Sequence, residues 1–200
     1  MPIEIPGKKG ETLLVDKDES PRQDVSLEKM AKLKTVYGSA TVTAANAPGL
    51  NSGASAIVLM RRKKAESLGL KPMATLEACE CAAGTPKFMV SVPAQTIDKM
   101  LEKNKKSIDD IDLIEINEAF AAVTLVSLKL LAKNDPKKWQ ELQEKTNVNG
   151  GAVAIGHPVG ASGARITMTL MYELMRRGGG LGTAAICGGL SQGEAVLIRV

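Results

Sequence analysis

The 200-residue sequence has few aromatic residues, only three cysteines and a single histidine. With two Phe, two Tyr and one Trp, the core must be built from aliphatic side chains and Met, and few rings are available to stack on nucleic-acid bases. Three cysteines do not make a disulfide framework, so a reducing cytoplasm is the expected compartment. No apolar run reaches the ~18 residues of a membrane span, and the N-terminus lacks the layout of a signal peptide.

The charge balance and the missing motifs exclude several classes of partner. A net charge of +4, from 26 basic and 22 acidic residues, is too mild for a nucleic-acid-binding stripe but suits a phosphorylated, anionic small molecule. The Cys and His spacings match no common zinc pattern, so no metal is expected. A P-loop and a dinucleotide-binding turn are also missing, which excludes those nucleotide folds.

Apolar runs of strand length alternate with helical periodicity along most of the chain. This alternation, with two adjacent strands at the C-terminal end, predicts a layered α/β fold with a mixed sheet. The strands are expected at 41–43, 54–60, 73–81, 112–116, 181–187 and 195–200. The helices are expected at 26–34, 61–68, 93–103, 118–133, 136–144 and 161–176, and residues 1–25 are expected to form an extended arm or loop.

Two features of this pattern concern strands near the N-terminal end of the α/β region. The run Ala54–Met60 is typical of a buried strand, yet no neighbouring strand lies near it in the sequence. We therefore hypothesise that it completes a sheet belonging to a part of the protein that this chain lacks. In the following strand, Cys79 and Cys81 share one face, which is expected to lie in the core.

The only histidine, His157, lies in the glycine-rich segment Gly150–Arg165 and is followed by Pro158. A lone His is more often structural, but flanking glycines allow close approach of a ligand, which favours a functional site here. Cys187 ends an apolar strand and enters the glycine-rich segment Gly188–Gly193. It is either a small core residue or a reactive thiol, and the second role requires a partner, such as His157, that lowers its pKa.

Asn117 and Glu118 follow the short strand at 112–116. The carboxyl end of a strand is where α/β folds place their binding sites, so both residues are site candidates. A common alternative is that Asn117 is only the N-cap of the next helix.

Taken together, these segments resemble the thiolase family over the whole chain. The stretches that carry the resemblance, in order, are Thr43–Gly53, Asn117–Ala121, Gly150–Arg165 and Cys187–Gly193. The resemblance implies a thiolase-like layered α-β-α half with a mixed five-stranded sheet, plus a strand and helix that complete the sheet of a missing N-terminal half. It divides the chain into the tail of a loop region (1–45), the last strand and helix of the N-terminal half (46–70) and the C-terminal domain (71–200).

The resemblance also implies catalytic roles. Cys187 corresponds to the acid/base cysteine that moves a proton to or from the substrate carbon. His157 would activate the nucleophilic cysteine and hydrogen-bond a thioester oxygen, and Asn117 would hold a water that completes this oxyanion site. Gly189 would offer a backbone amide to the second oxyanion. The nucleophilic cysteine belongs to the N-terminal half, and neither Cys79 nor Cys81 stands in its motif.

Further positions correspond to residues that contact coenzyme A or the acyl group. They are Ala44, Ala45, Pro48, Leu50, Met89 and Phe120. Coenzyme A thioesters are the implied substrates, with no cofactor or metal. The family usually has Ser where this chain has Pro48, which lacks a side-chain donor and puts that contact in question. The turn around Met89 is shorter than usual, and 134–147 corresponds to an insertion.

These implications lead to a hypothesis about assembly. The chain is expected to be one subunit of a split thiolase, active only with a second polypeptide equivalent to the N-terminal half, in a higher hetero-oligomer; Met1 as a natural start favours this. One alternative is a non-catalytic, thiolase-like scaffold subunit, and another is a truncated fragment of an ordinary thiolase. A ketoacyl synthase is disfavoured because those sites use two His and this chain has one.

Overall fold

A mixed sheet of four strands lies at the centre of the computed structural model, which describes residues 2–18 and 20–200. In spatial order the strands are β3 (Thr75–Ala83), β6 (Gln192–Arg199), β5 (Leu181–Gly188) and β4 (Leu113–Ile116). The β4–β5 pair is parallel and the other two pairs are antiparallel. The expected α/β fold with a mixed sheet is therefore confirmed.

The expectation of a fifth strand is not met in the described residues, because the edge beside β4 carries only one bridge. Thr146 forms an isolated parallel bridge with Ile114. The chain then turns at Asn147, whose φ of 48° is left-handed. Its side-chain amide, in place of strand backbone, accepts from the N–H of Ile116 at 2.8 Å and donates to the Ile116 carbonyl at 2.9 Å. These contacts satisfy the edge of β4 without a strand.

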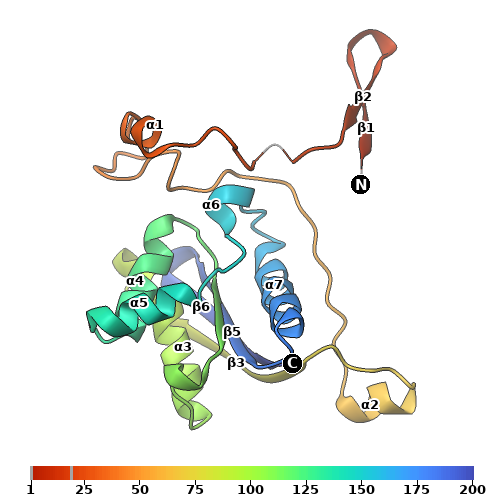
Figure 1. Cartoon of the computed structure of the whole chain (residues 1–200), viewed down its shortest axis with the longest axis vertical. Coiled ribbons are helices and arrows are strands. Elements are labelled where there is room, and N and C mark those ends of the chain that lie inside the picture. The colour runs from red at the N-terminus through yellow and green to blue at the C-terminus, as the bar shows by residue number, and fades with distance from the viewer. Residues whose placement is uncertain (1, 19) are drawn as a thin grey trace.

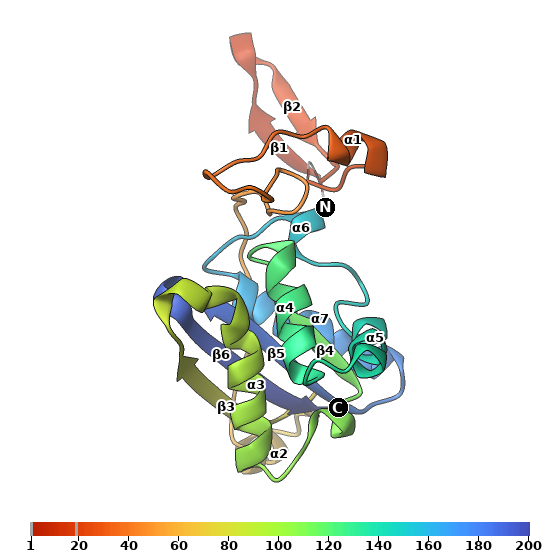
Figure 2. The ribbon, with the colours of Figure 1, turned by 90° about the vertical axis from the view of Figure 1, so that its left-hand side faces the viewer.

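Helices cover the two faces of the sheet unequally (Figure 2). One face packs against α3 (Val92–Lys103) and, around β4, α4 (Ala121–Leu131), and it holds the larger apolar cluster. The other face packs against α7 (Ser162–Arg176), mainly over β4 and β5. Two further helices of this α/β body are the short α6 (Ala152–Ile155) and α5 (Pro136–Glu144). Within the described residues, no helix is long and apolar enough to cross a membrane.

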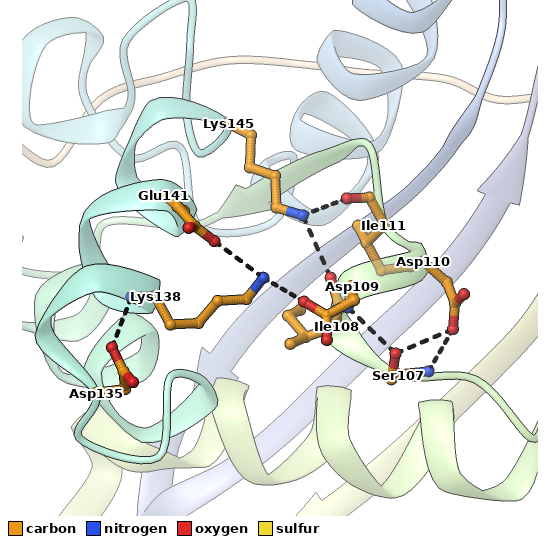
Figure 3. A network of polar contacts seen from close by, with 9 residues as sticks. All are labelled: Ser107, Ile108, Asp109, Asp110, Ile111, Asp135, Lys138, Glu141 and Lys145. Carbon is orange, nitrogen blue, oxygen red and sulfur yellow. Dashed lines mark hydrogen bonds and ion pairs between the residues drawn. The ribbon is translucent and has the colours of Figure 1, made fainter.

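The helix α5, which occupies the expected insertion, is tied to the turn before β4 (Figure 3). Lys138 forms ion pairs with Asp109 and with Glu141. The ammonium group of Lys145 donates to the carbonyl of Ile108 at 3.3 Å and also to that of Ile111. This network fixes the segment that leads to Asn147, and through it the edge strand β4.

The first 70 residues extend away from this α/β body (Figure 1). They contain a hairpin of β1 (Ile3–Pro6) and β2 (Thr12–Val15), which the expectation of an arm or loop did not include. Helix α1 (Leu27–Ala31) is capped by Ser26 as expected, since its hydroxyl accepts from the N–H of Lys29 at 3.2 Å. Helix α2 (Arg62–Ser67) ends before Gly69, which has a φ of +66°.

The segment Ala54–Met60 does not form the buried strand that its apolar sequence predicts. It has no regular secondary structure, and Val58 and Leu59 are 83% and 73% exposed. Figure 1 shows it running past α7 towards α2 as uncoiled chain. No strand in the described residues pairs with the segment, so the hypothesis that it completes the sheet of a missing part stays a prediction.

The prediction that Cys79 and Cys81 lie in the core is also wrong, because both are exposed. Glu80, between them on the edge strand β3, points to α3 and pairs with Lys99 and Lys103. Strand alternation therefore turns both cysteines to the opposite face of the sheet, where α7 covers mainly β4 and β5.

Candidate active site

The loop between α6 and α7 carries His157 and holds both nitrogens of its ring in polar contacts. Nδ1 lies 2.6 Å from the hydroxyl of Ser162, the first residue of α7. Nε2 lies 3.3 Å from Nδ2 of Asn117, which follows β4. The structure thus brings together two of the residues that the sequence predicted, His157 and Asn117, and adds Ser162, which the sequence analysis missed.

The hydrogen bonds around Ser162 favour one tautomer of His157. The Ser162 hydroxyl donates to the carbonyl of Pro158 at 3.1 Å and has only one proton to give. In this arrangement its oxygen accepts from Nδ1–H of His157, and the lone pair on Nε2 accepts from Nδ2 of Asn117. Burial, and next the charge of Arg165, lower the pKa of His157, so the ring is neutral at pH 7 and Nε2 is a base.

Replacement of Ser162 by Ala is expected to weaken this tautomer preference, because Nδ1–H then loses its acceptor. The fraction of His157 protonated at Nε2 should rise at neutral pH. Since the chain has one histidine, the ¹⁵N signals of a labelled sample report this ratio without ambiguity. Replacement of Ser52, an exposed hydroxyl, provides the control. Unchanged ¹⁵N shifts in the Ser162→Ala variant would contradict the assignment.

Asn117 is a buried residue of the site and not a helix cap. Helix α4 begins at Ala121 with Phe120 as its N-cap, so the alternative role is excluded. The backbone N–H of Asn117 donates to the carbonyl of Ala185 on β5 at 2.9 Å, which anchors it to the sheet. The side chain is 1% exposed, and its Oδ1 has no hydrogen-bond partner in the described part of the chain. Such an unpaired buried acceptor is costly and is typical of functional positions.

Cys187 leaves the sheet at the same edge as Asn117, because β4 and β5 are parallel and both residues lie at their carboxyl ends. The thiol is 8% exposed and belongs to the apolar cluster under α3 and α4. Among the described residues, no hydrogen bond joins it to His157, the candidate for lowering its pKa. Burial instead raises the pKa of Cys187, so the sulfur is a protonated thiol at neutral pH.

Gly189 begins the turn that connects β5 to β6 and is exposed beside Cys187. The turn needs unusual backbone angles, since Leu190 and Ser191 have φ values of 59° and 58°. Ser191 holds this shape, because its buried hydroxyl donates to the carbonyl of Thr85 at 2.8 Å. The backbone next to Cys187 is therefore fixed in position, as an oxyanion-binding amide requires.

The residues predicted to contact coenzyme A lie on three segments. Ala44, Ala45, Pro48 and Leu50 belong to one loop, in which Leu50 is 92% exposed. That loop is tied to the start of α4 by the Ala121 N–H, which donates to the Asn46 carbonyl at 2.9 Å. It is tied to the loop that carries His157 by the His157 N–H, which donates to the Gly49 carbonyl at 3.0 Å.

The other two predicted binding residues are half-buried. Phe120 makes an edge-to-face contact with Tyr37, with 6.4 Å between ring centroids. Met89 lies in the 3-10 turn Pro86–Ser91 and packs against the larger apolar cluster. The described residues contain no group of three or more His, Cys, Asp or Glu that could hold a metal ion.

Two family models match the chain. The family model described as the thiolase C-terminal domain matches residues 70–200, and that of the thiolase N-terminal domain matches residues 1–63. The chain belongs to the thiolase family. It is 44% identical over all its length to acetyl-CoA acetyltransferase of Allochromatium vinosum and 43% identical to β-ketoadipyl-CoA thiolase of Pseudomonas aeruginosa.

Solved thiolases share the fold. The chain matches the Bacillus anthracis acetyl-CoA acetyltransferase with a TM-score of 0.87 and 44% identity, over 100% of this chain and 48% of that one. It matches human mitochondrial 3-ketoacyl-CoA thiolase with a TM-score of 0.81 and 36% identity, over 99% and 48%. Among the curated relatives it covers 49% of the A. vinosum protein and 48% of the P. aeruginosa protein. The chain thus spans about half the length of these thiolases.

Proposed function

We propose that this chain supplies the proton-transfer half of a thiolase site and that a partner chain supplies the nucleophilic cysteine. The reaction is the coenzyme-A-dependent Claisen condensation of two acetyl-CoA to acetoacetyl-CoA and CoA, or the thiolysis of a 3-ketoacyl-CoA. The observation that carries the proposal is the neutral ring of His157, whose Nε2 is kept as a base by Ser162 and Asn117. No cofactor or metal is needed for this chemistry.

In the condensation, Nε2 of His157 takes the proton of the partner's thiol. The thiolate attacks acetyl-CoA, and CoA leaves as a thiolate as the acetyl-enzyme forms, while Nε2 of His157 keeps its new proton. The CoA thiolate takes the proton of Cys187, and a second acetyl-CoA then loses a methyl proton to the thiolate of Cys187. Its enolate, with negative charge met by Nε2–H of the protonated His157 and by an Asn117-held water, attacks the acetyl group. Collapse of the adduct releases acetoacetyl-CoA and the nucleophilic thiolate, which takes its proton back from His157.

Thiolysis runs these steps backwards, and Cys187 then acts as the acid that protonates the departing enolate. The raised pKa of Cys187 keeps the thiol in the protonated form that this step needs. In the synthetic direction the same thiol first gives its proton to the departing CoA.

The partner is proposed to be a polypeptide equivalent to the thiolase N-terminal half, in a higher hetero-oligomer. The exposed apolar segment Ala54–Met60 supports this, since it has strand composition but no strand of the described residues beside it. The free cysteines of the chain are compatible with a reducing cytoplasm, which we propose as its compartment.

Purification of the chain with and without its partner tests the proposal. The chain alone is expected to show no thiolysis of acetoacetyl-CoA, because neither Cys79 nor Cys81 is placed to form an acyl-enzyme. Activity should appear when the co-purified partner is added, and it should be lost if the partner's nucleophilic cysteine is replaced by Ala. Robust thiolysis by the chain alone would refute the proposal.

A further inference from the structure

Glu118, directly after Asn117, holds the beginning of the segment that ends at His157. Its Oε2 accepts a hydrogen bond from the backbone N–H of Val153, in the first turn of α6, at 3.0 Å. The helix has only four residues, and its N-cap is Gly151, which has no side chain to satisfy the free amides. Glu118 therefore performs from a different loop the capping role that an N-cap side chain normally performs.

The close approach of Glu118 also explains the glycine at position 151. A Cβ added to Gly151 would lie 2.5 Å from Oε2 and 2.8 Å from Cδ of Glu118. The φ of −146° at Gly151 is open to any residue, so a side chain here would have to displace the Glu118 carboxylate but would not strain the backbone. The carboxylate thus lies against the backbone of 151 while it bonds to Val153.

The two neighbouring residues Asn117 and Glu118 therefore contact the segment 151–157 at both of its ends. Asn117 contacts the ring of His157, and its neighbour Glu118 contacts the backbone four to six residues before that ring. At the far end of the segment, Arg165 donates to the carbonyl of Gly156 at 2.9 Å. Between these contacts Gly156 has a left-handed φ of +84°, which lets the chain turn into His157.

We propose that Glu118 is a positioning residue that fixes the loop bearing His157. Its importance for turnover rests on the proposed function, whereas its effect on the ring of His157 does not. Without the carboxylate, the first turn of α6 loses its cap and the loop becomes free to move. Water then reaches the imidazole, and the contact between Nε2 and Asn117 lengthens.

NMR spectroscopy of the full chain tests this directly, because the imidazole of His157 gives the only histidine signals. In Glu118→Ala these signals should broaden or shift, and the pKa of His157 should rise towards its ordinary value as burial is lost. Glu118→Gln keeps an oxygen acceptor without the charge, so it should resemble the wild type. Glu144→Ala, which removes an exposed carboxylate at the end of α5, is the matched control.

A double-mutant cycle with Gly151→Ala separates the effect of the Glu118 contact from a general disturbance of the fold. In the wild type the new methyl group collides with Glu118 and should perturb the His157 signals strongly. In the Glu118→Ala background the same methyl group has room, so the two effects should be clearly less than additive. Variants that keep the fold are identified by a wild-type pattern of sheet amide signals. In the double variant Glu118→Gln with Gly151→Ala the collision is kept, so the His157 signals should again be strongly perturbed.

Two results would overturn the proposal, and neither depends on a partner chain. One is a His157 titration in Glu118→Ala that matches the wild type. The other is a Gln variant that changes the signals as much as Ala, since charge and not the hydrogen bond would then be responsible. In the reconstituted complex, Glu118→Ala should lower kcat about tenfold or more with KM little changed, because misplacement by ~1 Å can cost ~10²-fold. An inactive wild-type complex would refute the proposed function and leave the NMR result standing.

Discussion

Replacement of Cys187 by Ser is expected to lower thiolysis by the complex of this chain and its partner by about 10²–10⁴-fold, the usual contribution of a general acid or base. A serine hydroxyl is far too weak an acid to exchange a proton with the enolate, although it fits the same space. The rate of acetoacetyl-CoA cleavage, followed by loss of its absorbance, gives the measurement. KM should change little, because the burial of Cys187 limits its contact with bound substrate to the reacting carbon.

The chain offers its own controls for this experiment. Cys79→Ser and Cys81→Ser remove exposed thiols from β3 and should leave the rate unchanged. The partner's cysteine should still become acetylated by acetyl-CoA in the Cys187→Ser complex, since that step uses His157. Full activity of the Cys187→Ser complex would instead indicate that this chain is a non-catalytic scaffold, the alternative that Pro48 raises.

Replacement of Glu115 by Gln is expected to stabilise the chain at alkaline pH. Glu115 lies on β4 two residues before Asn117, is 4% exposed, and forms part of the face that packs against α7. Burial first, and then the charge of Glu118, raise the pKa of this carboxyl from 4.5 to about 8, against the opposing effect of Arg165. The folded state therefore holds a proton that the unfolded chain releases near pH 4.5.

The sign of the pH dependence follows from that difference in proton binding. Between pH 4.5 and about 8 the native carboxyl binds more protons than the unfolded one, so the free energy of unfolding falls as the pH rises. At about 1.4 kcal/mol per pKa unit, the loss is on the order of 5 kcal/mol. Gln stays neutral at every pH and removes this loss in the free energy of unfolding.

Urea unfolding at a series of pH values measures this effect. The Gln variant and the wild type should differ least near pH 4.5 and most above pH 8, where the variant is the more stable. Glu144→Gln, at an exposed position, should follow the wild type throughout. A Glu115→Gln variant whose stability runs parallel to the wild type at all pH values would show that the buried carboxyl is not protonated in the folded state.

Local signals in the sequence predicted most helices and the central strands. Helix α5 begins at Pro136 and ends at Glu144, as its composition indicated, because Pro favours a first helical turn and Asp135 caps it from the preceding position. The α2 helix ends before Gly69 for a similarly local reason. Such features depend on a few neighbouring residues, so the order of the chain is enough to predict them.

Three expectations that the described residues do not meet concern contacts made with distant parts of a structure. Ala54–Met60 has the composition of a buried strand, but a strand needs a neighbour, and the described chain provides none. Cys79 and Cys81 look apolar enough for a core, yet they face the side of β3 that α7 leaves uncovered. The missing fifth strand depends on Asn147, whose side chain replaces backbone pairing.

The sequence alone determined which residue types form the candidate site: a single His in a glycine-rich loop, a Cys at a strand end and an Asn after a neighbouring strand. Only the tertiary structure decided their chemical states. Ser162 keeps the proton on Nδ1 of His157 and frees Nε2 as a base, while burial keeps Cys187 protonated. Proton positions depend on burial and on partners brought together by folding, such as Asn117 and His157, which are 40 residues apart in the chain.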